Sequence, residues 1–336
     1  MPAIRSSQNK GKCSKLRLFS TRGTRFGWFE KFDAFVSVEE HTDLAHDVDL
    51  AVDYARRYHA ICPERFYVKI PLTPAGILAT RRLSQEGIPI NHTLGFSARQ
   101  NYVIARVAKP AFVNVFLGRL NSFVADNHLG DGAYIGEKAT LASQRTVRDL
   151  RETNLTTARQ IGASYRQASQ VRDLAGIDVI TMPTKVADQF LQMDIQPEQI
   201  SDKTATDYAP GISQDTDPQA IRLNTLWEVG DELIACVEAL EKENIDSFSA
   251  GDLIDFFDEH GCGDVLVRWS DSQVETSAKE GKIPQLHNWK EALESRAIGL
   301  DSLMNLAGLN SFATDQREMD KRVKEVQQKS NPERKK

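Results

Sequence analysis

The feature that most constrains the fold is a regular alternation of short β-rich runs with amphipathic helical stretches, from about Phe32 to Gln192. This alternation is typical of βα units around a parallel sheet. The predicted strands are Phe35–Glu39, Phe66–Ile70, Ile88–Leu94, Phe112–Leu117, Gln160–Ser164 and Ile177–Met182. The predicted helices are Asp47–Tyr58, Pro74–Glu86, Ala98–Val107, Tyr134–Glu152, Ser169–Ala175 and Lys185–Gln192. Gly87 and Gly176 are predicted to end helices as C-terminal caps.

The pattern becomes mostly helical after Ser201. Pro210–Pro218, rich in Asp, Pro and Gly, predicts a loop. Ser249 to Asp252 has the spacing of a capping box ahead of an apolar run. Leu300–Val326 predicts a final long helix or a pair of helices. The fold class expected is therefore α/β with a mostly helical C-terminal extension.

Composition excludes several classes of protein. Among 336 residues, 40% are hydrophobic, 26% are charged and the net charge is -5. No apolar run approaches the length of a membrane span, and mild acidity gives no electrostatic case for nucleic-acid binding. The four cysteines and seven histidines are scattered, without a C-x-x-C pair or ligand spacing. This argues against a metal site and favours a reducing, cytoplasmic compartment.

The first 31 residues differ from the rest. Met1 to Phe29 contains seven Lys or Arg and no Asp or Glu. Three interpretations are open: an organellar transit peptide, a disordered arm, or sequence not native to the fold. A nucleic-acid-binding arm is a weaker hypothesis, because the segment has few aromatic residues and no recognisable motif.

Lys69 stands at the carboxyl end of a predicted buried strand. In the run FYVKIP, which begins at Phe66, side chains alternate, so Tyr67 and Lys69 share one face. Pro71 lacks the amide that a ladder needs and ends the strand. Most lysines are solvated, but burial disfavours the ammonium form and frees the amine to attack a ketone. In βα barrels, this end of the strands holds the active site.

Polar side chains recur where neighbouring strands end. The pairs that share a face are Ser37 with Glu39, Asn91 with Thr93, Asn114 with Phe116, and Ser164 with Arg166. One such pair is easily a satisfied core group, but four pairs and a lysine indicate a convergent polar pocket. Arg119 and Arg166 add two guanidiniums suited to a phosphate. The residues alone therefore favour Schiff-base chemistry on a phosphorylated carbonyl compound.

These motifs resemble the transaldolase family in order and spacing, over about Asp33 to Ser201. A further similarity, Ser311–Gln316, matches the family's closing helix. The motifs are Val36–Glu39, Val68–Pro71, Glu86–Pro89 with Asn91–Thr93, Phe116–Arg119, Gly162–Arg166 and Thr181–Pro183. The resemblance implies a (β/α)8 barrel that moves a dihydroxyacetone unit from a ketose phosphate to an aldose phosphate, in the pentose phosphate pathway. It implies no metal and no organic cofactor.

The resemblance also implies roles for individual residues. Lys69 would be the Schiff-base nucleophile, and Glu39 with Thr93 would hold the water that carries protons. Asn91 would bind hydroxyls of the dihydroxyacetone unit. Asn114, where many relatives have Ser, would still donate a hydrogen bond.

The phosphate would lie between Arg119, Ser164 and Arg166, and Phe116 would line the pocket. Glu39 and Phe116 favour transaldolase over the related fructose 6-phosphate aldolases, which resemble it but carry Gln and Tyr there.

Two family features have no counterpart in this sequence: a first strand that ends in an acid/base Asp, and a Thr-Thr-Asn-Pro turn after the second. Leu16–Phe19 is the one candidate strand upstream of Asp33. We therefore expect a barrel that is incomplete or altered at strands 1–2, and favour a non-native origin for residues 1–31.

The remaining residues, 32–336, are expected to form the barrel. Within them, 210–287 is predicted to be an insertion that covers the flank or serves a homo-oligomer contact, and 300–326 a helical segment. The alternative function is a degenerate, non-catalytic barrel that binds sugar phosphates.

Overall fold

A computed structural model describes residues 33–330, with the side chains of residues 33–327. The expectations for residues 1–31, including the strand at Leu16–Phe19, lie outside the described residues.

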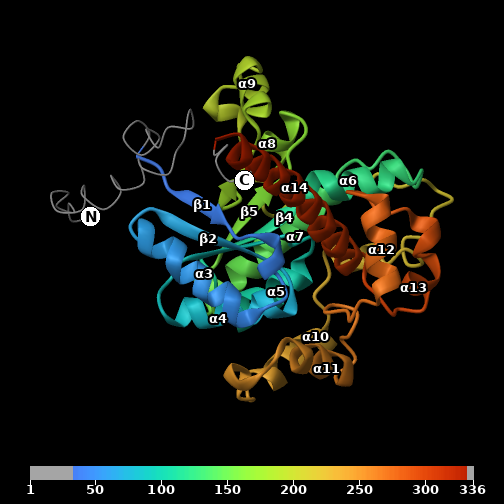
Figure 1. The fold of residues 1–336 in the computed structure, drawn as a ribbon. Helices are drawn as coiled ribbons and strands as arrows, with labels where there is room; N and C mark the ends of the chain where they lie inside the picture. Colours follow the sequence, from blue (N-terminus) through green and yellow to red (C-terminus); the bar gives the residue numbers. More distant parts are fainter. Residues whose placement is uncertain (1–32, 331–336) are drawn as a thin grey trace.

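Six parallel strands form one sheet in the order β1-β2-β3-β4-β5-β6. Each predicted strand is confirmed: β1 Val36–Glu39, β2 Phe66–Pro71, β3 Ile90–Thr93, β4 Phe112–Phe116, β5 Arg159–Ala163 and β6 Val179–Ile180. The sheet curls strongly into a half-barrel (Figure 1). The Asn91 side chain on β3 reaches across β2 to donate to Ser37 on β1 at 3.0 Å, which a flat sheet would not allow. The α/β class is confirmed, and closure by eight strands stays a prediction.

Helices follow the strands and cover the outer face of the sheet. The predicted helices are confirmed as α3 Val48–Ile61, α4 Pro74–Gln85, α5 Ala98–Val107, α7 Ile135–Glu152, α8 Ser169–Asp173 and α9 Thr184–Gln192. Gly87 and Gly176 have φ of +77° and +100°, the left-handed region that a glycine tolerates at a helix end. Sequence analysis missed α6 (Leu117–Asp126) because β4 runs directly into it, and Phe116 at the junction provides no side-chain cap to mark the start of a helix.

The outer face of the sheet packs against these helices in separate apolar clusters. Val68, Ile70 and Ile90 lie against Ala51 and Val52 of α3, and against residues of α4. The inner face carries the polar residues of the strand ends. Alternation along each strand therefore separates core from site, as predicted.

Beyond Ser201 the described residues contain no strand: residues 201–230 are mostly loop and turns, which includes the predicted loop Pro210–Pro218, and the remainder is mostly helical. Its α-helices are α10 Asp231–Leu240, α11 Ala250–Glu259, α12 Asp271–Glu280, α13 Lys290–Glu294 and α14 Leu300–Ser330. The capping box at Ser249 and Asp252 is confirmed, and the C-terminal segment is one helix rather than two. Within residues 33–330, no helix is both long and apolar enough to cross a membrane.

The long helix α14 crosses in front of the sheet (Figure 1) and is attached near both ends. Near its start, Asp301 accepts hydrogen bonds from Arg99 of α5 at 2.7 and 2.9 Å. Further along, Asp320 lies 3.0 Å from His41, which follows β1. These contacts hold the middle of α14, including Phe312, against the strand ends.

Candidate active site

Lys69 and Glu39 face each other across neighbouring strands. The two residues are paired in the register of β1 and β2, and the Lys69 Nζ atom lies 3.3 Å from Glu39 Oε2. The Lys69 side chain is 21% exposed, and its ammonium lies 5.7 Å from the centre of the Phe312 ring on α14. A shielded amine beside a carboxylate is the arrangement that carbonyl condensation needs, because the carboxylate can accept and return protons.

Asn91 connects three strands next to Lys69. It is the register partner of Lys69 on β3, donates to Ser37 on β1, and accepts from Asn114 Nδ2 on β4 at 2.8 Å. Asn91 and Asn114 are buried. The Thr93 hydroxyl, two residues further along β3, is buried and has no partner among the described residues. It can therefore bind a water or a substrate group.

The guanidinium of Arg119 lies beside two aromatic rings near these residues. Its guanidinium carbon is 5.7 Å from the centre of the Phe116 ring and 5.5 Å from that of Phe312. Its Nη1 atom is buried and has no hydrogen-bond partner in the described part of the chain. Lys69 and Arg119 therefore both lie beside the Phe312 ring, which brings the amine and the guanidinium into the same region of the fold.

A second guanidinium increases the positive charge. Burial, and then the charge of Arg166, lower the pKa of Arg119, and Asp315 only partly opposes them. Two neighbouring guanidiniums, whose side chains have no hydrogen-bonded carboxylate among the described residues, attract an anion. A phosphate fits this site because a guanidinium offers two parallel donors.

The backbone around Gly118 brings these arginines together. A Cβ atom at Gly118 would lie 2.1 Å from the Ser164 carbonyl oxygen and 2.9 Å from Arg166 Cγ, so only glycine allows this approach. Ser164 itself has a φ of +68°, an unfavourable conformation for serine that is common at functional sites. The ends of β4 and β5 thus meet at the anion site.

The structure therefore gathers the sequence-predicted residues along one edge of the sheet. Sequence analysis assigned no role to two residues of α14, Phe312 and Asp315. Both lie in the motif Ser311–Gln316, which was noticed only as a similarity. Their contribution depends on how α14 packs back over the sheet from a distant part of the chain, which local patterns do not contain.

Glu40, next to Glu39, is buried and has a different environment. It is 3% exposed, and burial raises its pKa to about 8. The folded protein therefore holds a proton at Glu40 that the unfolded chain loses above its ordinary value of 4.5. The contribution of this proton to the free energy of unfolding is fully present below pH 4.5 and is lost as the pH rises through about 8.

We predict that Glu40→Gln flattens the pH dependence of stability in this window. The wild-type free energy of unfolding should fall between pH 4.5 and 8, with a slope of up to about 1.4 kcal/mol per pH unit from this group. Urea unfolding at several pH values measures the slope. Glu86→Gln, at a carboxyl whose hydrogen bond with Arg56 lowers its pKa, is a control that should leave this slope in place. Equal slopes in wild type and Glu40→Gln would contradict the prediction.

Comparison with known proteins agrees with the family resemblance of the sequence motifs. The model of the family Transaldolase/Fructose-6-phosphate aldolase matches residues 15–252. The match begins inside the atypical N-terminal segment and ends inside segment 210–287, so it extends beyond the block of motifs from about Asp33 to Ser201 at both ends.

Curated relatives match over a shorter stretch. A transaldolase of Xanthomonas campestris is 36% identical over 154 residues, 44% of this chain and 47% of the relative. A transaldolase of Xanthomonas oryzae is 34% identical over the same shares. A probable transaldolase of Thermus thermophilus is 36% identical over 150 residues, 44% of this chain and 60% of the relative. The chain spans about half the length of the Xanthomonas relatives it matches. Since the family model covers well over half of the chain, the protein belongs to the transaldolase/fructose-6-phosphate aldolase family.

Proposed function

We propose that this protein is a transaldolase, which transfers a dihydroxyacetone unit from sedoheptulose 7-phosphate or fructose 6-phosphate to an aldose phosphate. One observation carries the proposal: the amine of Lys69, beside Glu39, approaches the same Phe312 ring as the guanidinium of Arg119, whose buried Nη1 atom has no hydrogen-bond partner among the described residues. A ketose phosphate presents a carbonyl at one end and a dianion at the other, which suits these two groups.

In the proposed reaction, the neutral amine of Lys69 attacks the ketone carbon of the sugar. Glu39 and the free Thr93 hydroxyl hold a water that moves protons as the carbinolamine loses water to give the imine. Asn91 and Asn114 would bind hydroxyls of the dihydroxyacetone unit. Arg119, Arg166 and Ser164 would hold the phosphate, while Phe116 and Phe312 limit access of bulk water to the covalent intermediate.

Carbon–carbon cleavage needs a further acid/base group. The family resemblance implies that an Asp at the end of the first strand supplies this acid/base group. No such strand lies among residues 33–330. Loss of a general acid/base typically slows a reaction by about 10²- to 10⁴-fold. We therefore expect adduct formation to be less affected than transfer. This point also supports the second candidate, a non-catalytic barrel that binds sugar phosphates.

Borohydride trapping tests the proposal directly. Incubation with fructose 6-phosphate and sodium borohydride should reduce the imine and leave a stable sugar adduct on Lys69, identified by peptide mass mapping. Omission of borohydride is the control, since the imine then hydrolyses. Folded protein in which Lys69 stays unmodified would exclude Schiff-base catalysis and favour the binding-only function. The cytoplasmic location, the domain boundaries and a homo-oligomeric state stay predictions.

A further inference from the structure

Two free cysteines lie together in the helical C-terminal region, far along the chain from Lys69. Cys236 is on α10, and Cys262 follows α11. Both thiols are free, both belong to the apolar cluster beneath α5, and they are 1% and 4% exposed. The two thiols are close enough to influence each other's ionisation. Neighbouring thiols need little movement to form a disulfide bond.

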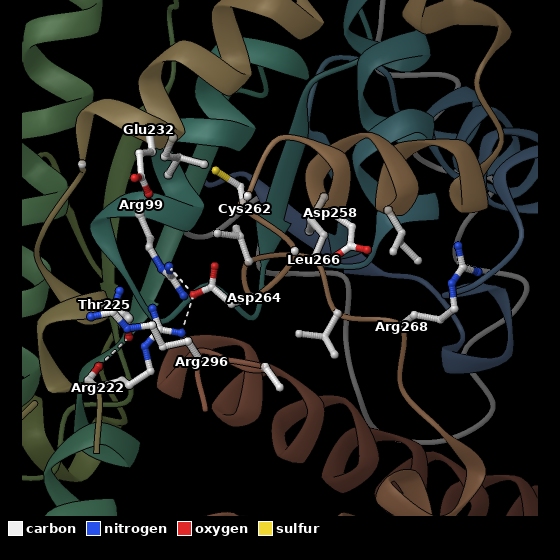
Figure 2. Close-up of a pocket in the computed structure, with 18 of the residues that line it drawn as sticks. Arg99, Arg222, Thr225, Glu232, Asp258, Cys262, Asp264, Leu266, Arg268 and Arg296 are labelled. Atoms are coloured by element: carbon white, nitrogen blue, oxygen red, sulfur yellow. Dashed lines mark hydrogen bonds and ion pairs between the residues drawn. The ribbon is translucent and has the colours of Figure 1, made fainter. Parts of the chain in front are cut away.

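A polar cleft leads to one of the two sulfurs. The cleft has a volume of about 610 Å³, and Cys262 lines it whereas Cys236 does not. Figure 2 shows Cys262 between α10, which carries Glu232, and the loop that carries Asp264. Asp264 is fixed by ion pairs with Arg99 at 2.7 Å and Arg222 at 2.8 Å. A small polar molecule can therefore approach Cys262 through an ordered opening, with Cys236 lying behind it.

The chemistry of the pair is asymmetric. The hydrogen bond from Cys236 lowers the pKa of Cys262, and Arg99 adds to this effect against burial, Asp264 and Glu232. The same hydrogen bond, followed by burial, raises the pKa of Cys236. Cys262 is therefore the better nucleophile, since the thiolate is the reactive form, and Cys236 is the proton-bearing partner.

We propose that Cys236 and Cys262 form a redox-sensitive dithiol that a small hydroperoxide converts to a disulfide. The Cys262 thiolate attacks one peroxide oxygen, an S–O bond forms as the O–O bond breaks, and the expelled alkoxide or hydroxide takes up the proton that Cys262 released on ionisation and leaves as an alcohol or water. Cys236 then attacks the sulfur of the resulting sulfenic acid, the S–O bond breaks, and the second water leaves with the Cys236 proton. In sum, two thiols are oxidised to one disulfide, and the peroxide is reduced to an alcohol or water plus water.

Mass spectrometry of the native full chain tests this site. After hydrogen peroxide and alkylation of the remaining thiols, a tryptic map should contain a peptide pair joined by Cys236 and Cys262 that has lost two hydrogen atoms. Dithiothreitol should separate the pair. In Cys236→Ser, Cys262 should stop at the sulfenic acid and react with dimedone. In Cys262→Ser, Cys236 should stay unmodified at the same peroxide dose.

Other outcomes would overturn the proposal. If both thiols are alkylated after peroxide treatment, while far-UV circular dichroism shows folded protein, the pair is only a packing contact. Equal oxidation of Cys236 in wild type and Cys262→Ser would exclude the proposed order of attack. Because the linked peptide is sought in the unsubstituted chain, the test holds even if a variant fails to fold.

Discussion

Lys69→Ala should reduce transfer of the dihydroxyacetone unit on the order of 10⁶-fold, the scale known for removal of a covalent nucleophile. Alanine cannot condense with the ketone, and no other lysine among the described residues contacts Glu39 and Phe312 as Lys69 does. The borohydride adduct should disappear with the activity. Steady-state kinetics with fructose 6-phosphate and an aldose phosphate, together with trapping, measures both effects.

Binding of the substrate should survive this substitution. Arg119 and Arg166 do not depend on Lys69 for their positions, so phosphate-ester binding measured by calorimetry should change by less than about tenfold. Lys185→Ala is a matched control, because Lys185 is an exposed lysine on α9 and its loss should leave kinetics and trapping unchanged. If the parent protein binds fructose 6-phosphate but Lys69→Ala changes neither rate nor adduct, the chain is a binding protein rather than a Schiff-base enzyme.

The sequence predicted most of the sheet because the physics there is local. In β2, alternation alone places Val68 toward the helices and Lys69 toward the site, and Pro71 ends the strand. The six strands and the helices between them follow from patterns of this kind. The helix α6 was missed because Phe116 and Leu117 carry no cap or turn signal between strand and helix.

The candidate site could be predicted only in part, because short sequence patterns report local structure and not long-range packing. Residues at strand ends, such as Glu39 and Asn91, meet because parallel strands bring their carboxyl ends to one edge, which is a general rule. Phe312 reaches Lys69 through the packing of α14, more than 240 positions later in the numbering. That contact depends on tertiary anchors, including a buried carboxylate, that no short pattern reveals.

The carboxylate of Asp301 anchors α14 to α5. Asp301 is fully buried, and it accepts hydrogen bonds from Ser97 at 2.6 Å and from Arg99 at 2.7 and 2.9 Å. Burial alone would lower the pKa of Arg99, but Asp301 and Asp264 raise it above its ordinary value, so the guanidinium stays charged. Removal of one partner of a buried pair leaves an uncompensated charge.

Asp301→Ala should therefore destabilise the protein by about 3–5 kcal/mol, or lower its melting temperature by roughly 4–7 °C for a chain of this size. Urea unfolding and thermal scans measure the change. The matched control is Asp246→Ala, which removes the carboxylate of a more exposed pair with Arg81 at 2.8 Å and should cost at most about 1 kcal/mol. Equal losses in both variants would show that Asp264 alone compensates Arg99. A selective loss in Asp301→Ala, together with slower borohydride trapping at Lys69 in the protein that stays folded, would show that this anchor also positions Phe312 over the amine.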